Sequence, residues 1–245
     1  MRDIGLDVDE VQPRERVDRE VGEMLDEAPR VVRELPAPAL DDRVGVRERR
    51  VHVDDGLTPC GSNAHVGVVT DYRCRDEPLV PASPSRCFDA LADLGTYARW
   101  WTLVAVKSDG PTRLAPGVRP RFAGARPGGE RVEWPAEVLE AEPPARIELA
   151  YTGGEYEGRT GWEVVADGDG ARVAYVYRGV RPVSDSARGH FARWGTRLHG
   201  VAMQEDALAG LARFFGGPGA ELDDAAWAAD VRRRVAAGIR ALEVA

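Results

Sequence analysis

The chain has 245 residues, 43% hydrophobic and 30% charged, so it is long enough to bury a substantial core as one or two domains. Its net charge of -8 argues against nucleic acid as the main partner, because binding phosphates requires a basic surface. No run approaches the ~20 apolar residues that span a bilayer, and the acidic N-terminus lacks the apolar core of an export signal.

The cysteine and histidine pattern predicts neither a disulfide framework nor a metal site. Cys60, Cys74 and Cys87 cannot all pair and form no CxxC motif, so we expect reduced thiols in a cytoplasmic protein. The spacing of His52, Cys60 and His65 matches no ligand pattern of a metal site. The sequence also contains no glycine-rich phosphate loop, nucleophile elbow or paired-cysteine zinc motif. We therefore expect no metal and no cofactor.

Residues 1–70 differ in composition from the rest of the chain. All 17 aromatic residues lie from Tyr72 onward, whereas the first 69 residues carry 16 acidic and 10 basic side chains. Such a segment cannot bury much apolar surface, so we expect disorder, with at most a marginal helix over residues 14–34. A second explanation is that the strong excess of arginine over the single Lys107 reflects a GC-rich coding sequence. Natural translation would then begin near residue 68 or 69, and residues 1–67 would not be native.

The first predicted elements of the folded part are a strand and two short helices. Residues 72–80 form a strand that Pro81 ends. Ser83 is a favoured N-cap and Pro84 suits the first helical position, so a helix is predicted over residues 84–94. Aromatic residues at 97, 100 and 101 predict a second short helical turn.

From residue 118 the apolar period changes to two, which indicates strands. Apolar and charged residues alternate over 132–138, 147–151, 156–164 and 173–179. Pro143-Pro144, Gly153-Gly154 and Asp169-Gly170 separate these segments, and the last pair favours a tight hairpin. The pattern predicts an antiparallel meander with one apolar, aromatic face and one charged face.

The end of the chain is predicted to be helical. Apolar residues recur every three or four positions over residues 185–215, which predicts one long amphipathic helix. The run Gly216-Gly217-Pro218-Gly219 stops it, and a final helix is expected over residues 222–242. A sheet with one apolar face and one long apolar helix stripe pack together as a two-layer α+β domain.

Several of these motifs, in this order, resemble the START-like (SRPBCC) superfamily, and within it the polyketide cyclase/dehydrase-like families. The opening run Pro81-Ala82-Ser83-Pro84 with Trp100-Trp101 resembles the family's first helices. The turn at Glu142-Pro143-Pro144 and the long helix with Gly210-Leu211 fit as well. The resemblance implies a START-like domain over residues 71–216, preceded by the extension at 1–70 and followed by an extra C-terminal helix at 217–245.

The implied fold is the α+β helix-grip fold, a curved antiparallel sheet wrapped around a long C-terminal helix, with a cavity between them. We expect the cavity to bind a small apolar molecule, lipid-, quinone- or polyketide-like. Inward-facing aromatic and apolar side chains would form the ligand-binding wall. These are Trp101, Trp134, Tyr151, Tyr156, Trp162, Tyr175, Tyr177, Trp194 and Leu198. A register slip of one residue would reverse the strand assignments.

Three residues are candidates for acid–base chemistry. Glu205 falls on the helix stripe, where an apolar cavity would shift the pKa of its carboxyl group. His199 lies one residue from the stripe and titrates near neutral pH. The phenol of Tyr177 is the third candidate. If Glu205 lies at the helix edge in water, or if His199 is half-exposed, neither takes part in a reaction.

Three functions remain open on the sequence. The first is a small-molecule binding protein. The second is a polyketide cyclase or dehydratase, in which the cavity holds a poly-ketone in a folded shape and a Tyr, His or Glu moves protons. The third is a non-catalytic interaction or co-chaperone module that uses the outer sheet face and the last helix. The sequence determines neither the ligand nor the oligomeric state.

Overall fold

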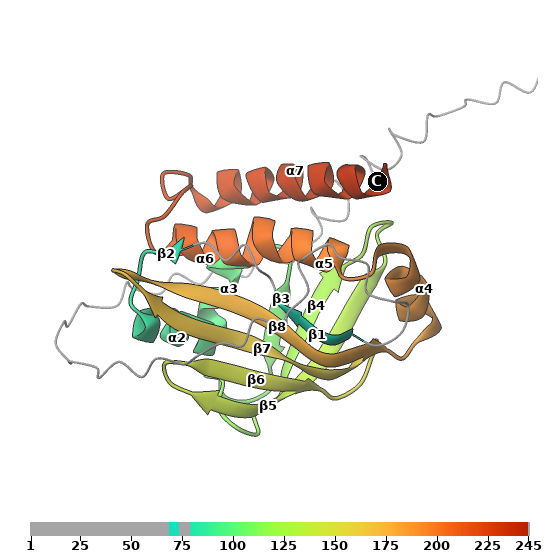
Figure 1. Ribbon diagram of the computed structural model, residues 1–245, viewed down its shortest axis with the longest axis horizontal. Coiled ribbons are helices and arrows are strands. Elements are labelled where there is room, and N and C mark those ends of the chain that lie inside the picture. The colour runs from blue at the N-terminus through green and yellow to red at the C-terminus, as the bar shows by residue number, and fades with distance from the viewer. Residues whose placement is uncertain (1–68, 74–78, 245) are drawn as a thin grey trace, which may run out of the picture.

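The computed structural model describes residues 69–73 and 79–244 (Figure 1). The expectations for residues 1–67, including the helix over 14–34 and the upstream start, therefore lie outside the described residues. So do Cys60 and Cys74, whereas Cys87 is a buried free thiol.

An antiparallel sheet forms one layer of the domain. Its strands are β1 (Val69–Arg73), β2 (Leu79–Val80), β3 (Ala105–Ser108), β4 (Pro120–Ala125), β5 (Arg131–Glu142), β6 (Arg146–Tyr151), β7 (Tyr156–Asp167) and β8 (Gly170–Pro182). The order is β1-β8-β7-β6-β5-β4-β3, and β2 also pairs with β8. Among the described strands β1 and β3 do not pair with each other, so the sheet stays open. The predicted α+β helix-grip architecture is confirmed.

The predicted strand over residues 72–80 corresponds to two segments on the same edge. Asp71 pairs with Arg178 in β8, while Val80 pairs further along β8 with Ala171. The sequence analysis did not predict β3, so it expected fewer strands than the sheet contains. β3 is only four residues long, and β4 contains Pro120 and Gly124, which weaken a strand pattern.

The turn between β7 and β8 is a two-residue hairpin, as expected, but its centre differs from the prediction. Asp167 pairs with Gly170, so Gly168 and Asp169 form the turn. Gly168 has a φ of 56°, and no described residue other than glycine has a positive φ. The glycine therefore supplies the left-handed conformation that the turn requires, and Asp169 does not.

The helices are α2 (Pro84–Ala92), η1 (Leu94–Thr96), α3 (Tyr97–Trp100), α4 (Asp185–Trp194), α5 (Arg197–Ala202), η2 (Met203–Leu208), α6 (Ala209–Phe214) and α7 (Asp224–Glu243). In Figure 1, α5 and α6 lie across the concave side of the sheet, and α7 forms a further layer over them.

The predicted long helix over residues 185–215 is interrupted in two places. Gly195 ends α4 with a φ of 58° and a ψ of -136°. Further on, η2 is a π-helical turn, which inserts one extra residue into the helical repeat. The apolar residues of this segment therefore divide between two clusters. Trp194 and Leu198 pack with α7, whereas Phe191, Met203, Leu208 and Leu211 pack in the main core.

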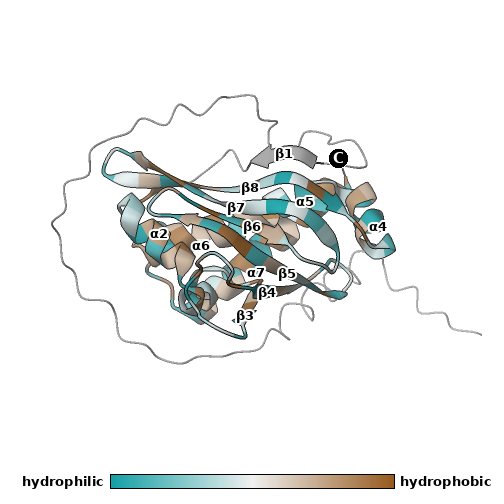
Figure 2. Ribbon diagram, turned by 90° about the horizontal axis from the view of Figure 1, so that it is seen from below, coloured by the Kyte–Doolittle hydropathy of each residue, from teal (hydrophilic) through white to brown (hydrophobic). Residues whose placement is uncertain are grey.

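The core lies between the sheet and α2, α3 and α6. Trp100 and Trp101 are 0% and 6% exposed and pack edge-on against Trp162, with ring centroids 5.9 Å and 5.7 Å away. A second cluster joins Trp194 and Leu198 to the apolar side of α7. Figure 2 shows hydrophilic and hydrophobic bands along β7 and β8, as the alternating sequence predicts.

Helix α6 approaches α3 so closely that only glycine fits at residue 210. A Cβ atom there would lie 1.9 Å from the carbonyl oxygen of Trp100. By contrast, a Cβ on Gly189, in the exposed part of α4, would meet nothing within 4 Å.

We predict opposite effects of the same substitution at these two glycines. Gly210→Ala should lower the free energy of unfolding by about 3 kcal/mol or more, because the backbones of α6 and α3 must separate. Gly189→Ala should raise it by ~0.5–1 kcal/mol, because alanine favours the helix. Urea denaturation of both variants checks this, and equal destabilisation would contradict the close packing.

Candidate functional site

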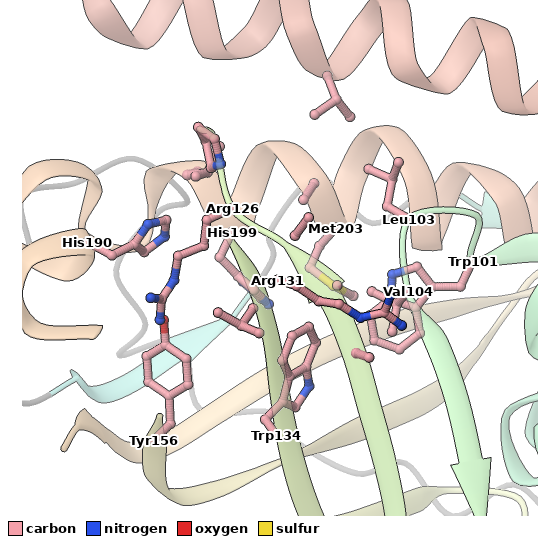
Figure 3. Close-up of a pocket in the computed structure, with 18 of the residues that line it drawn as sticks. Trp101, Leu103, Val104, Arg126, Arg131, Trp134, Tyr156, His190, His199 and Met203 are labelled. Carbon is pink, nitrogen blue, oxygen red and sulfur yellow. The ribbon is translucent and has the colours of Figure 1, made fainter. Parts of the chain in front are cut away.

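A cavity of about 260 Å³ lies between the open sheet and the helices α4 and α5 (Figure 3). Strands β3 to β8 contribute to its wall, as does the loop after α3 from Trp101 to Val104. Its volume exceeds that of an engineered protein cavity of about 150 Å³ that binds benzene. A cavity of this size takes a molecule of one or two rings or a short chain.

Most residues predicted to bind a ligand line this cavity. These are Trp101, Trp134, Tyr151, Tyr156, Tyr175, Tyr177 and Leu198. His199 and Met203, from the helical side, also contribute to the wall. Met203 is an adaptable apolar side chain that suits the wall of a binding site.

Three predicted site residues lie elsewhere. Trp162 packs in the core against Trp100 and Trp101, and Trp194 packs in the cluster under α7. Glu205 pairs with Arg234 of α7 and is 38% exposed, so it is a surface ion pair rather than a cavity acid. The π-helical turn explains this, because its extra residue turns Glu205 outward and the adjacent Asp206 inward.

The deep wall of the cavity carries three phenols and an imidazole. Tyr175 and Tyr177 contact each other edge-on, with ring centroids 5.7 Å apart, and Tyr151 contacts Tyr177 at 6.5 Å. Burial is the largest cause of the raised pKa of Tyr151. The ring of His199 lies 4.4 Å from that of Tyr177, and burial lowers the pKa of His199 to about 3. His199 is therefore neutral at physiological pH, and the wall offers hydroxyl and imidazole groups without charge.

A buried arginine lies at the other end of the cavity. Arg126, at the start of the β4–β5 turn, is 5% exposed. Its Nη1 donates to Glu130 Oε2 at 3.0 Å and to Ser186 Oγ at 2.5 Å, and its Nη2 donates to Glu155 Oε2 at 2.7 Å. Figure 3 shows the hydroxyl of Tyr156 beside the guanidinium group. Burial acts to lower the pKa of Arg126, but these hydrogen bonds outweigh it and raise the pKa. The cluster ties the β4–β5 turn to α4 and to the start of β7.

His190 of α4 lies beside this cluster (Figure 3). Burial lowers its pKa to about 4, and the nearby charge of Arg126 acts in the same direction. His190 is therefore neutral near pH 7. Sequence reasoning missed Arg126 and His190, because a single arginine in a glycine-rich turn and a single histidine on a short helix carry no periodic signal.

Asp206 fixes the loop that forms one wall of the cavity. Its side chain is fully buried, and its carboxylate accepts hydrogen bonds from Thr102 N, Thr102 Oγ1 and Leu103 N, each at 2.8 Å. Burial raises the pKa of Asp206 to about 6, although these hydrogen bonds oppose the shift. The carboxylate thus joins the π-helical turn to the loop that contributes Trp101 and Leu103 to the cavity.

Within residues 69–73 and 79–244, no cluster of three or more His, Cys, Asp or Glu side chains is placed to hold a metal ion. None of the described helices combines the length and the apolarity needed to cross a bilayer.

Comparison with known proteins identifies a family for most of the folded part. Residues 74–216 match the model of the family described as polyketide cyclase / dehydrase and lipid transport. Among curated proteins, none is significantly similar to this chain.

Solved structures that are similar to this chain come from several bacteria. Protein CV1439 from Chromobacterium violaceum is 17% identical with a TM-score of 0.45, and the alignment covers 60% of this chain and 96% of that one. Protein Ms6760 from Mycobacterium smegmatis is 15% identical with a TM-score of 0.45, covering 59% and 90%. Protein TTHA0849 from Thermus thermophilus is 19% identical with a TM-score of 0.44, covering 68% and 97%.

We predict that Asp206→Ala lowers the free energy of unfolding by about 3 kcal/mol, because three partly buried donors in the 102–103 loop lose their acceptor. The loss should depend on pH. The pKa of the Asp206 carboxyl rises from 3.8 to about 6 on folding, so the unfolded chain ionises first as the pH rises. The part of the stability that depends on the protonation of Asp206 is fully present below pH 3.8 and is lost as the pH rises to about 6.

Urea denaturation at about pH 5 and about pH 7 measures this effect. The difference between the wild type and Asp206→Ala should be larger at the lower pH. The difference isolates Asp206 from other titrating groups, because both proteins contain the same histidines and surface carboxylates. A difference that grows with pH would contradict the raised pKa.

Proposed function

Because the chain belongs to the polyketide cyclase / dehydrase and lipid transport family, we propose that it binds a small, largely apolar molecule with an aromatic or quinone-like part. The observation that carries this proposal is the cavity of about 260 Å³ with its aromatic wall. Ligand sites in proteins are concave and mostly apolar, with a few convergent polar groups that fix orientation.

The composition of the wall supports a neutral ligand. Tyr151, Tyr175 and Tyr177 line the cavity from the sheet. The opposite wall comes from helix α5, with Leu198 and the small Ala202. A planar ring can stack between these walls, and a carbonyl or hydroxyl group on it can pair with a phenol.

Filling the cavity should abolish this binding. We predict that Ala202→Phe, which adds a ring from α5, lowers the affinity for an uncharged apolar fluorescent probe such as phenylnaphthylamine at least about tenfold. Ala229→Phe is the matched control, because Ala229 is exposed on the outer side of α7. The control should bind the probe as the wild type does.

Native mass spectrometry of the full chain, purified gently from its own host, complements the probe. A reproducible extra mass that disappears in Ala202→Phe would identify the ligand. Equal probe binding by both variants and the wild type, without any extra mass, would refute a ligand cavity at this place.

A second candidate function is an enzyme of the cyclase or dehydratase type, and one contact favours it. The imidazole of His199 lies against the phenol of Tyr177 at the cavity wall. A phenol that donates a hydrogen bond to a carbonyl oxygen favours enolisation, and a neutral imidazole can accept a proton. Glu205 has no part in this scheme, because it pairs with Arg234 on the far side of the helix.

If the chain has such an activity, we predict that its rate depends little on pH between about 5 and 8. The reason is that the pKa of His199, lowered to about 3 by burial, lies below this range. Turnover of a model poly-ketone followed across this range checks the prediction, with Tyr177→Phe and His199→Ala as variants. A rate that rises with a midpoint near pH 6.5, and a midpoint that disappears in His199→Ala, would show that His199 titrates normally and is not buried in the working protein.

The third function, an interaction module, has less support in the structure. The large apolar residues Trp227, Val231, Val235 and Ile239 of α7 are buried against the rest of the chain, so they are not available to a partner. The large exposed hydrophobic residues in the described part, Leu79, Leu139, Val183 and Val244, come from separate elements. Scattered single residues of this kind are normal on soluble proteins.

A further inference from the structure

The family match ends at residue 216, yet the cavity does not end there. Two residues of α7, Val235 and Ile239, line it together with residues of the sheet and of α5. They are one helical turn apart and therefore lie on the same side of α7. Both are nearly fully buried.

Small residues and a helix break allow α7 to reach the cavity. Gly195, where α4 ends and the chain turns into α5, lines the cavity, and so does Ala202 at the end of α5. Glycine has no side chain and that of alanine is one methyl group, so neither residue separates the cavity from α7. Leu103, from the loop held by Asp206, lines the cavity and also packs against the α7 cluster. The cavity thus continues past α5 toward α7.

Contacts along the whole length of α7 hold it against the rest of the chain. At its start, Arg213 Nη2 donates to Leu222 O at 2.6 Å and to Asp224 Oδ1 at 2.9 Å. In the middle, Gly238 packs so closely on Val201 that a Cβ would lie 2.5 Å from a methyl group.

The second half of α7 is tied to the preceding helices by charge. Arg234 pairs with Glu205 of η2. Near the end of the helix, Glu243 pairs with Arg193 of α4, with a nitrogen–oxygen distance of 3.2 Å. Together with the contacts at its start, these pairs hold α7 in one position over α5.

We propose that α7 is a specificity-determining wall of the ligand site, and that Val235 and Ile239 set how long a saturated chain the ligand can carry. This inference rests on the proposed binding function. The two ends of the cavity differ in chemistry. The sheet end has phenols and indoles, whereas the α7 end has Leu103, Val235 and Ile239. The matching ligand class is an aromatic ring with one polar substituent and a short alkyl chain that points toward α7.

A series of 4-alkylphenols, from ethyl to heptyl, tests this in titration calorimetry with the full chain. In the wild type, affinity should rise about fourfold with each methylene until the chain meets α7, and then fall. In Val235→Ala and Ile239→Ala, the chain length of highest affinity should increase by about one to three carbons, the volume that each substitution frees.

Val231→Ala is the matched control. Val231 lies one turn before Val235 on the same buried side of α7 and is 0% exposed, but it does not line the cavity. The control removes the same two methyl groups from the same helix, so it should be destabilised without any change in preferred chain length. Val235→Ile, which adds a methylene to the wall, should shift the preference to a shorter chain and serves if the alanine variants unfold.

The outcomes separate the two proposals. If the wild type shows a preferred chain length that neither Val235→Ala nor Ile239→Ala moves, or that Val231→Ala moves equally, α7 does not set specificity while the binding function stands. If no alkylphenol binds to any of the proteins although thermal melts show them folded, both the wall and the proposed binding of such ligands are refuted.

Discussion

The three hydrogen bonds that Asp206 accepts join parts of the chain about a hundred residues apart, and the shape of the cavity depends on them. A carboxylate buried without partners is very costly, so the loop that carries Thr102 and Leu103 must stay against the π-helical turn. That turn in turn positions Met203 on the cavity side. The constraint is local, but it fixes the distance between the helical layer and the β3 edge of the sheet.

The empty volume follows from how the two layers meet. The described sheet is open, so the wall that a closed barrel would supply at the β3 edge has to come from other elements. The aromatic residues of β8 fill one end well, as the edge-on contact between Trp162 and Tyr175 at 4.7 Å shows. The helical side offers Gly195 and Ala202 instead of large side chains. Protein cores pack at a nearly constant density, so they do not loosen to fill space that small side chains leave empty. That space remains as a cavity.

Much of the fold could be predicted from periodicity, because the inner face of a meander alternates with its charged outer face. The strands from residue 131 onward, α2 and α7 all correspond to patterns in the sequence. The inward face of the strands was predicted as well, in that Tyr151, Tyr175 and Tyr177 line the cavity. The short β3 and the interruptions of the long helix could not be predicted, since four residues carry little pattern and a π-helical turn has no composition of its own.

The site was less predictable than the fold, for a physical reason. In the π-helical turn η2, Asp206 rather than Glu205 is on the buried side, and no propensity distinguishes the two side chains there. Arg126 is held at the cavity by Glu130 of the β4–β5 turn, Glu155 of the turn before β7 and Ser186 of α4. Contacts of this kind join residues distant in sequence, and a single sequence does not encode them as a motif.

The electrostatics of the cavity bear on the choice between a carrier and an enzyme. The charge of Arg126 is offset by two carboxylates, and burial keeps His190 and His199 neutral. A second cation, Arg131, also lines the wall, but it is exposed at the start of β5. Among the buried groups, an ionised ligand would lose its hydration and meet only neutral side chains and the paired Arg126. Charge that builds up during a reaction would be poorly stabilised there, so the phenols would act by hydrogen bonding to a carbonyl group rather than by giving up their protons. This environment suits the binding of a neutral ring compound, and it would leave a reaction dependent on a held conformation and on hydrogen bonds to a carbonyl oxygen.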